Sequence, residues 1–154
     1  SVSSELTKQQ LEIISDWKWN KADMEQRVKD GTEVGFVHEC IQKVYPDPST
    51  IKVVPTDIMV KDFMELDLGD IQMELYARDS IHSRDALLVY IPKEKAFFVG
   101  DADCEDIYNN GEVKLGRVKE YREFINRFDF ERYFLGHDLP DTKDGVNKYL
   151  EELL

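Results

Sequence analysis

The sequence predicts an α/β protein of the α+β type, in which helices pack on a mostly antiparallel or mixed sheet. Two observations carry this prediction. Up to residue 46, apolar side chains recur at helical spacing between capping and breaking residues. From residue 51, short apolar or alternating runs between turn residues replace that period, and helical spacing returns near the end. We therefore expect a single domain over 1–154, with a helical segment at 1–46 and a sheet-containing part at 51–154.

Composition excludes several classes of protein. The chain has 154 residues, enough for one domain, and is 42% hydrophobic and 34% charged. Its net charge of −12 argues against a nucleic-acid-binding surface. It contains no apolar run long enough to cross a bilayer and opens without a signal-peptide pattern. The two cysteines lack metal or redox spacing, which favours a reduced, cytoplasmic setting.

Three short helices are expected in the N-terminal segment. Ser4 and Asn20 are suitable N-caps for the first two. Gly31 is a suitable stop for the second, and Pro46 ends the third. Their expected ranges are 4–15, 20–30 and 32–44.

The next part of the chain reads as strands. Residues 71–77 alternate between apolar and polar, as in a half-buried strand, whereas 86–91 are continuously apolar. The run at 96–99 follows after a short turn and is the expected antiparallel partner of 86–91. The expected strands are 51–54, 57–60, 63–68, 71–77, 86–91, 96–99 and 132–135. Helices are expected at 117–128 and at 143–153, the latter capped by Thr142.

Three polar residues follow or precede these strands and could form a site. Asp101 ends the apolar run at 96–99, where a carboxylate is costly without a positive partner. His82 lies in the loop before 86–91, and His137 follows the strand at 132–135. Two imidazoles and a carboxylate suit Zn, Mn or Fe. We therefore predict His82, Asp101 and His137 as metal ligands; the alternative is two surface histidines and a turn aspartate.

The order of these features resembles the metallo-β-lactamase fold superfamily. The resemblance runs from Leu68-Gly69-Asp70-Ile71, through the His82 loop and the strand that follows it, to Phe97-Phe98-Val99-Gly100-Asp101-Ala102, and then to Phe134-Leu135-Gly136-His137. In that family a histidine precedes a strand, a hairpin leads to Gly-Asp, and Gly-His follows on the last strand-to-helix loop. The resemblance covers roughly residues 51–154.

The resemblance also implies roles for the three candidate ligands. His82 would match the last histidine of the first metal site, Asp101 the carboxylate that bridges two metals, and His137 the histidine of the second site. The family's first-half motif, two histidines flanking one residue and then Asp-His, is absent from this chain, where only His38 remains. His38 lies in a predicted helix and is expected to be a surface or packed residue. We therefore expect the C-terminal portion of an αββα sandwich, with half of its ligands.

The function that follows is a metal-dependent hydrolase that uses metal-bound hydroxide on a small-molecule substrate, represented by a fragment with little or no activity of its own. The complete family binds two zinc ions, with Mn or Fe as alternates; the half-built site would bind one ion weakly or none. The first alternative is a non-catalytic binding module on the same scaffold with a lost metal site. A di-iron redox protein is the second. No catalytic or substrate-binding residue is assigned.

Other residues near Asp101 have simpler interpretations. Cys104 is expected to be a non-functional loop cysteine rather than a thiolate ligand. The acidic residues Asp103, Glu105 and Asp106 are expected to form a solvated loop rather than a cation site. Tyr108, with the turn that follows it, is a weaker candidate for substrate contact.

A half-sandwich leaves one face of its sheet without a partner. Leu87, Val89, Phe97 and Val99, or their alternating neighbours, would be exposed there. A monomer rarely leaves an apolar surface of that size open. We therefore expect a homo-oligomer, or association with the missing N-terminal half.

Overall fold

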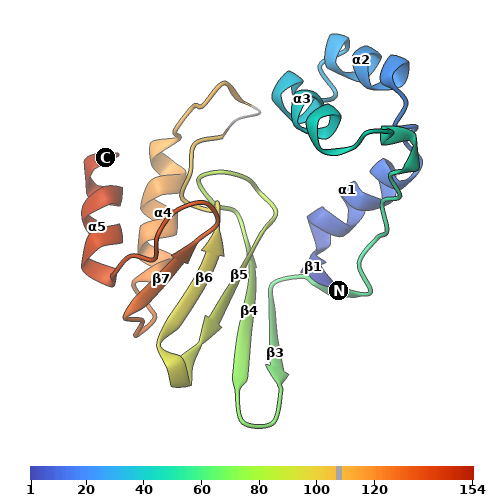
Figure 1. Ribbon diagram of the computed structural model, residues 1–154. Helices are drawn as coiled ribbons and strands as arrows, with labels where there is room; N and C mark the ends of the chain where they lie inside the picture. The colour runs from blue at the N-terminus through green and yellow to red at the C-terminus, as the bar shows by residue number, and fades with distance from the viewer. Residues whose placement is uncertain (107–108) are drawn as a thin grey trace. The chain divides into compact units, whose positions relative to one another are not determined.

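The computed structural model describes residues 1–106 and 109–154 (Figure 1). The chain divides into two compact units, one formed by Ser1–Lys8 with Thr56–Leu154 and the other by Gln9–Pro55. The boundary falls inside helix α1, Glu5–Ser15, so the first residues belong with the sheet rather than with the helices. Whether the chain acts as a single domain stays a prediction.

A five-stranded mixed sheet forms the larger unit, in the order β3-β4-β5-β6-β7. Neighbouring strands are antiparallel except for β6 and β7, which are parallel. The strands are β3 Phe63–Asp67, β4 Gln72–Arg78, β5 Ala86–Ile91, β6 Ala96–Gly100 and β7 Arg132–Leu135. Two helices, α4 Leu115–Ile125 and α5 Lys143–Glu152, lie along one side of the sheet (Figure 1). This arrangement confirms the predicted fold class.

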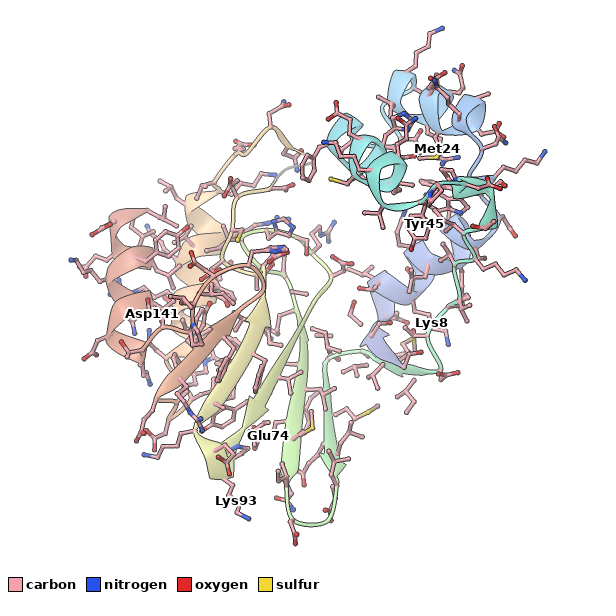
Figure 2. The ribbon with its side chains drawn as sticks, viewed as in Figure 1. Lys8, Met24, Tyr45, Glu74, Lys93 and Asp141 are labelled. Carbon is pink, nitrogen blue, oxygen red and sulfur yellow. The ribbon has the colours of Figure 1, made fainter. Side chains whose placement is uncertain are left out.

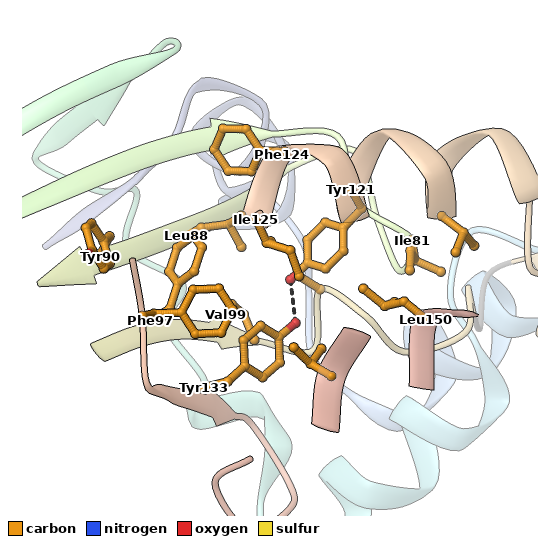
Figure 3. Packing of buried hydrophobic residues seen from close by; sticks show 14 residues of the cluster. Ile81, Leu88, Tyr90, Phe97, Val99, Tyr121, Phe124, Ile125, Tyr133 and Leu150 are labelled. Atoms are coloured by element: carbon orange, nitrogen blue, oxygen red, sulfur yellow. Dashed lines mark hydrogen bonds between the residues drawn. The ribbon is translucent and has the colours of Figure 1, made fainter. Parts of the chain in front are cut away.

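The core lies between this sheet and its helices (Figure 3). Phe97 is completely buried, and its ring lies 5.6 Å from that of Tyr90, 5.0 Å from Phe128 and 5.6 Å from Phe130. Leu88 of β5 is buried in the same cluster. Leu88 and Tyr90 therefore face the core, and the residues that alternate with them in the run at 86–91 are half-buried on the other face.

The opposite face of the sheet is apolar and partly open. The register pairs Val89 with Phe98, so the predicted grouping of Val89 with Phe97 and Val99 on one face is wrong; the alternating neighbour, Phe98, takes that place. The ring of Phe98 stacks on that of Phe134 at 4.4 Å and is 41% exposed. A hairpin shifted by one residue accounts for the difference, since each shift moves side chains to the other face.

A second, two-stranded sheet contacts β4 and β5. Its strands, β1 Val2–Ser4 and β2 Ile58–Val60, pair in parallel. Only β2 was predicted. The expected strand at 51–54 is wrong: these residues have no regular structure, and Pro55, which lacks an N–H group, follows them.

The predicted caps of α1 and of α2, Lys21–Lys29, are confirmed. Ser4 Oγ accepts from the Thr7 amide at 3.1 Å, and Asn20 Oδ1 accepts from the Asp23 amide at 3.1 Å. The third helix, α3 Gly35–Val44, begins three residues later than predicted. The amides of Thr32 and Glu33 instead bond the Arg27 carbonyl, which closes α2.

Trp17 and Trp19 pack in the helical unit on the guanidinium of Arg27, whose Cζ lies 4.4 Å and 5.1 Å from their ring centroids. Arg27 Nε donates to Glu33 Oε2 at 2.8 Å, and both side chains are largely buried. The two tryptophans therefore shield an ion pair from water. Across the described ranges of both units, no helix is long and apolar enough to cross a membrane.

Candidate metal centre

Asp101 and His137 lie together at the ends of β6 and β7. Because these strands are parallel neighbours, the residues that follow them emerge at the same edge of the sheet. His137 Nε2 is 3.3 Å from Asp101 Oδ2. The imidazole is 86% exposed, whereas the carboxylate is 35% exposed, so the pair is open to solvent on the histidine side.

Gly136 allows this approach because it has no side chain. A Cβ at this position would lie 2.3 Å from Asp101 Oδ1, far inside van der Waals contact. The Gly136 amide also donates to the Gly100 carbonyl at 2.9 Å, which holds the two loops together. Asp101 Oδ1 itself is buried and has no hydrogen-bond partner within residues 1–106 and 109–154. A buried carboxylate oxygen in this state suits a cation.

His82 is tied to the same region through the turn after β6. Its amide donates to the Ala102 carbonyl at 3.3 Å. Its ring Nδ1 lies 2.7 Å from the Glu105 carbonyl oxygen, which can only accept, so the proton is on Nδ1. In the neutral ring Nε2 then carries the lone pair, as in metal-binding histidines whose other nitrogen bonds a carbonyl.

The structure thus brings Asp101 and His137 into contact and ties His82 to the turn that follows Asp101. Over the part of the chain that is described, no three His, Cys, Asp or Glu side chains are close enough to form a metal-binding group. The donor chemistry of Asp101 and His82 fits a divalent cation, but the assignment of all three residues as ligands stays a prediction.

A cavity of about 360 Å³ adjoins the Asp101–His137 pair. Asp141, labelled in Figure 2, is on its wall and pairs with Tyr133 of β7 through two backbone hydrogen bonds of 2.8 and 2.9 Å. Lys93 lies at the far end of the sheet in the same view. The lining residues are Asp101, Asp103, Cys104, Tyr133, Leu135, Gly136, His137, Asp138, Asp141, Val146 and Tyr149.

The expectation of a solvated acidic loop after Asp101 is wrong for two of its three residues. Asp103 is 3% exposed and Asp106 is 6% exposed, whereas Glu105 faces solvent. Asp103 accepts from the Tyr133 hydroxyl at 3.1 Å, and burial raises the pKa of its carboxyl. Asp106 Oδ2 lies 3.7 Å from Arg117 Nη1. The sequence carried no signal for these partners, which come from a later strand and helix.

His38 lies in α3, half-buried, with Nε2 3.0 Å from the Gln42 amide nitrogen, as expected for a packed helix residue. Tyr108 falls outside the described residues.

Cys104 is expected to react slowly with alkylating agents at neutral pH. Burial, followed by the nearby charges of Asp103 and Asp101, raises the pKa of its thiol to about 11. Since only the thiolate is nucleophilic, the alkylation rate should keep rising through pH 10. Iodoacetamide labelling of a Cys40→Ser variant, followed by mass spectrometry across pH 7–11, measures this; a rate that levels off near pH 9 would contradict it.

Comparison with known proteins finds likeness at the level of structure. No family model matches the sequence, and no curated protein matches it. An archaeal metallo-β-lactamase superfamily protein from Sulfolobus tokodaii superposes with a TM-score of 0.55 at 15% identity, over 99% of this chain and 57% of that one. The chemotaxis sensor ODP from T. denticola, solved as a peroxy diiron species, gives 0.50 at 18% identity, over 62% of this chain and 51% of that one. The chain spans about half the length of these structures. Its fold is that of the metallo-β-lactamase superfamily.

Proposed function

We propose that this chain supplies the Asp101 side of a metal-dependent hydrolase site of the metallo-β-lactamase fold. One observation carries the proposal: Asp101 has a buried oxygen without a partner among the described residues, beside the exposed imidazole of His137. Asp101, His137 and His82 would hold the ion. A divalent cation there would supply Lewis acidity and would lower the pKa of water.

The chain's own residues have definable tasks in such a site. Asp101 supplies negative charge at the edge of the sheet, because the turn after β6 holds its backbone and Gly136 leaves room for its carboxylate. The Glu105 carbonyl keeps the His82 proton on Nδ1, which leaves the lone pair of Nε2 to serve as a metal ligand. With the first-half histidine motif absent from the sequence, we propose weak binding and little activity for the chain alone.

Metal titration tests the proposal. After chelator treatment, the chain should bind Zn²⁺ in isothermal titration, and Asp101→Ala should weaken binding at least about tenfold. Asp129→Ala is the matched control, because that aspartate is 81% exposed and pairs with Lys95 at 3.2 Å, at the far end of β6. Equal affinity of the Asp101→Ala variant and the unaltered chain would remove Asp101 from the site.

Two other functions remain candidates on specific grounds. The ODP structure is of a peroxy diiron species, which favours a di-iron redox role as one candidate. The lack of a three-ligand group in the described residues favours a non-catalytic binding module as the other. Elemental analysis after purification separates them: zinc supports the hydrolase, iron the redox protein, and no metal, with no uptake on titration, the binding module.

We also propose that the open face of the sheet is covered by a further protein layer, formed by a second copy or by an N-terminal half of the fold. Its apolar composition and the exposed Phe98 support this proposal. Light scattering that finds only an 18.0 kDa monomer would contradict the second copy.

The unpaired cysteines, Cys40 and Cys104, support a proposed cytoplasmic location.

A further inference from the structure

The turn after β6, Gly100–Glu105, is the point to which the candidate ligand loops are attached. Ala102 accepts hydrogen bonds from the Ile81 amide at 3.0 Å and the His82 amide at 3.3 Å. The Gly100 carbonyl accepts from the Gly136 amide at 2.9 Å. The positions of His82 and His137 relative to Asp101 therefore depend on where this turn sits.

Asp103 is the part of the turn that enters the core. Its carboxylate accepts from the Tyr133 hydroxyl at 3.1 Å, and the Tyr133 and Tyr121 hydroxyls are 2.7 Å apart (Figure 3). Tyr133 has one hydroxyl proton and gives it to Asp103, so Tyr121 donates to Tyr133. The result is a directed chain from α4 through β7 to the turn. On the cavity side, the Tyr149 hydroxyl donates to the Asp103 carbonyl at 3.4 Å.

A buried chain of hydrogen bonds of this kind adds little to the stability of the fold. Tyr121 and Tyr133 are 2% and 0% exposed, and a carboxylate brought among them loses its hydration. Apolar side chains of similar size would fill the same space without that cost. Fully bonded polar networks instead fix one arrangement, because any displacement leaves a buried group without its partner.

We propose that Tyr133 is a positioning residue, which acts through Asp103 to hold the turn Gly100–Glu105 and, with it, the loops of His82 and His137 that are hydrogen-bonded to this turn. This inference deepens the proposed function and rests on it for the role of the three ligands. Neither Tyr133 nor Asp103 needs to touch the metal or a substrate for this role.

The experiment compares two tyrosine variants of the full chain after chelator treatment. Tyr133→Phe removes the donor to Asp103. Tyr90→Phe is the matched control, because Tyr90 lies in the same core. Its hydroxyl donates to the Asp129 carbonyl at 2.8 Å, away from the turn. Amide hydrogen exchange of His82 and Gly136 reports the attachment of the two loops, and the ¹⁵N shifts of the His82 ring report its tautomer.

Tyr133→Phe should speed exchange at both amides about tenfold more than Tyr90→Phe does, since it breaks a hydrogen bond to a buried charge. The His82 ring should also lose its preference for the tautomer that carries the proton on Nδ1. Equal exchange in the two variants, with the tautomer retained, would overturn the proposal. If Tyr133→Phe does not fold, Asp103→Asn, which keeps an acceptor, should preserve slow exchange better than Asp103→Ala; equal rates would again overturn it.

Zn²⁺ titration of the same variants separates the two proposals. If the unaltered chain binds Zn²⁺, Tyr133→Phe should weaken binding and Tyr90→Phe should not; equal affinities would overturn the positioning role. If the unaltered chain binds no Zn²⁺ and the exchange difference is present, the metal function fails while the attachment of the loops through Asp103 holds.

Discussion

Phe97→Ala should lower the free energy of unfolding of the sheet unit by about 3–5 kcal/mol. Phe97 is completely buried, and its ring contacts three other aromatic rings between β6 and the helices. The truncation removes a large apolar side chain and leaves a cavity that rigid neighbours cannot fill. Urea unfolding followed by circular dichroism measures the loss.

The adjacent residue provides the control. Phe98 has the same side chain but is 41% exposed on the other face and contacts mainly the ring of Phe134. Phe98→Ala should therefore cost only about 1 kcal/mol, the worth of one aromatic pair. Equal losses for the two variants would mean that the open face is as well packed as the helix-covered face, contrary to the observed burial.

Gly136→Ala should separate Asp101 from His137 and remove the weak cation binding that we propose for the site. The new Cβ would lie 2.3 Å from Asp101 Oδ1 and 3.2 Å from its Cγ, so the carboxylate must move. Overpacking of this kind costs about 1–3 kcal/mol of stability. Thermal unfolding, combined with Zn²⁺ titration, measures both effects.

Gly116→Ala is the matched control for that variant. Gly116 lies in α4, and a Cβ there would meet no heavy atom within 4 Å. Alanine should stabilise the helix by up to about 1 kcal/mol and leave metal binding unchanged. Unaltered Zn²⁺ affinity and melting temperature in Gly136→Ala would show that Asp101 can relocate freely, which would contradict its fixed position.

Local signals were sufficient for the elements of the mixed sheet and its helices. Alternation located β4, and the Thr142 cap, which accepts from the Gly145 amide at 3.1 Å, located the start of α5. β1 was missed because its partner, β2, lies more than fifty residues away and a three-residue run carries no periodicity. The prediction of a strand at 51–54 was wrong for a related reason. β propensity alone does not form a strand when no neighbouring strand pairs with it.

The candidate site also has a part that local sequence signals predict and a part that they do not. Asp101 and His137 could be named as candidates from the sequence because each comes soon after an apolar strand, whereas their contact depends on the parallel pairing of β6 with β7, which was not predicted. The hydrogen bond that holds the turn after Asp101 could not be predicted from the sequence. It joins Asp103 to Tyr133, 30 positions away, through a tertiary contact. An aspartate in a polar stretch reads as solvated, and only the fold shows that it points inward.

The parallel pairing of β1 with β2 also has a consequence for how the chain assembles. Strands β3 to β6 pair through short connections, so their contacts are local and should form early in folding. β1 can join β2 only after the long intervening segment has been brought back on itself, which delays the contact by its loop-closure entropy. The first residues of the chain should therefore dock last, onto a sheet that has already formed.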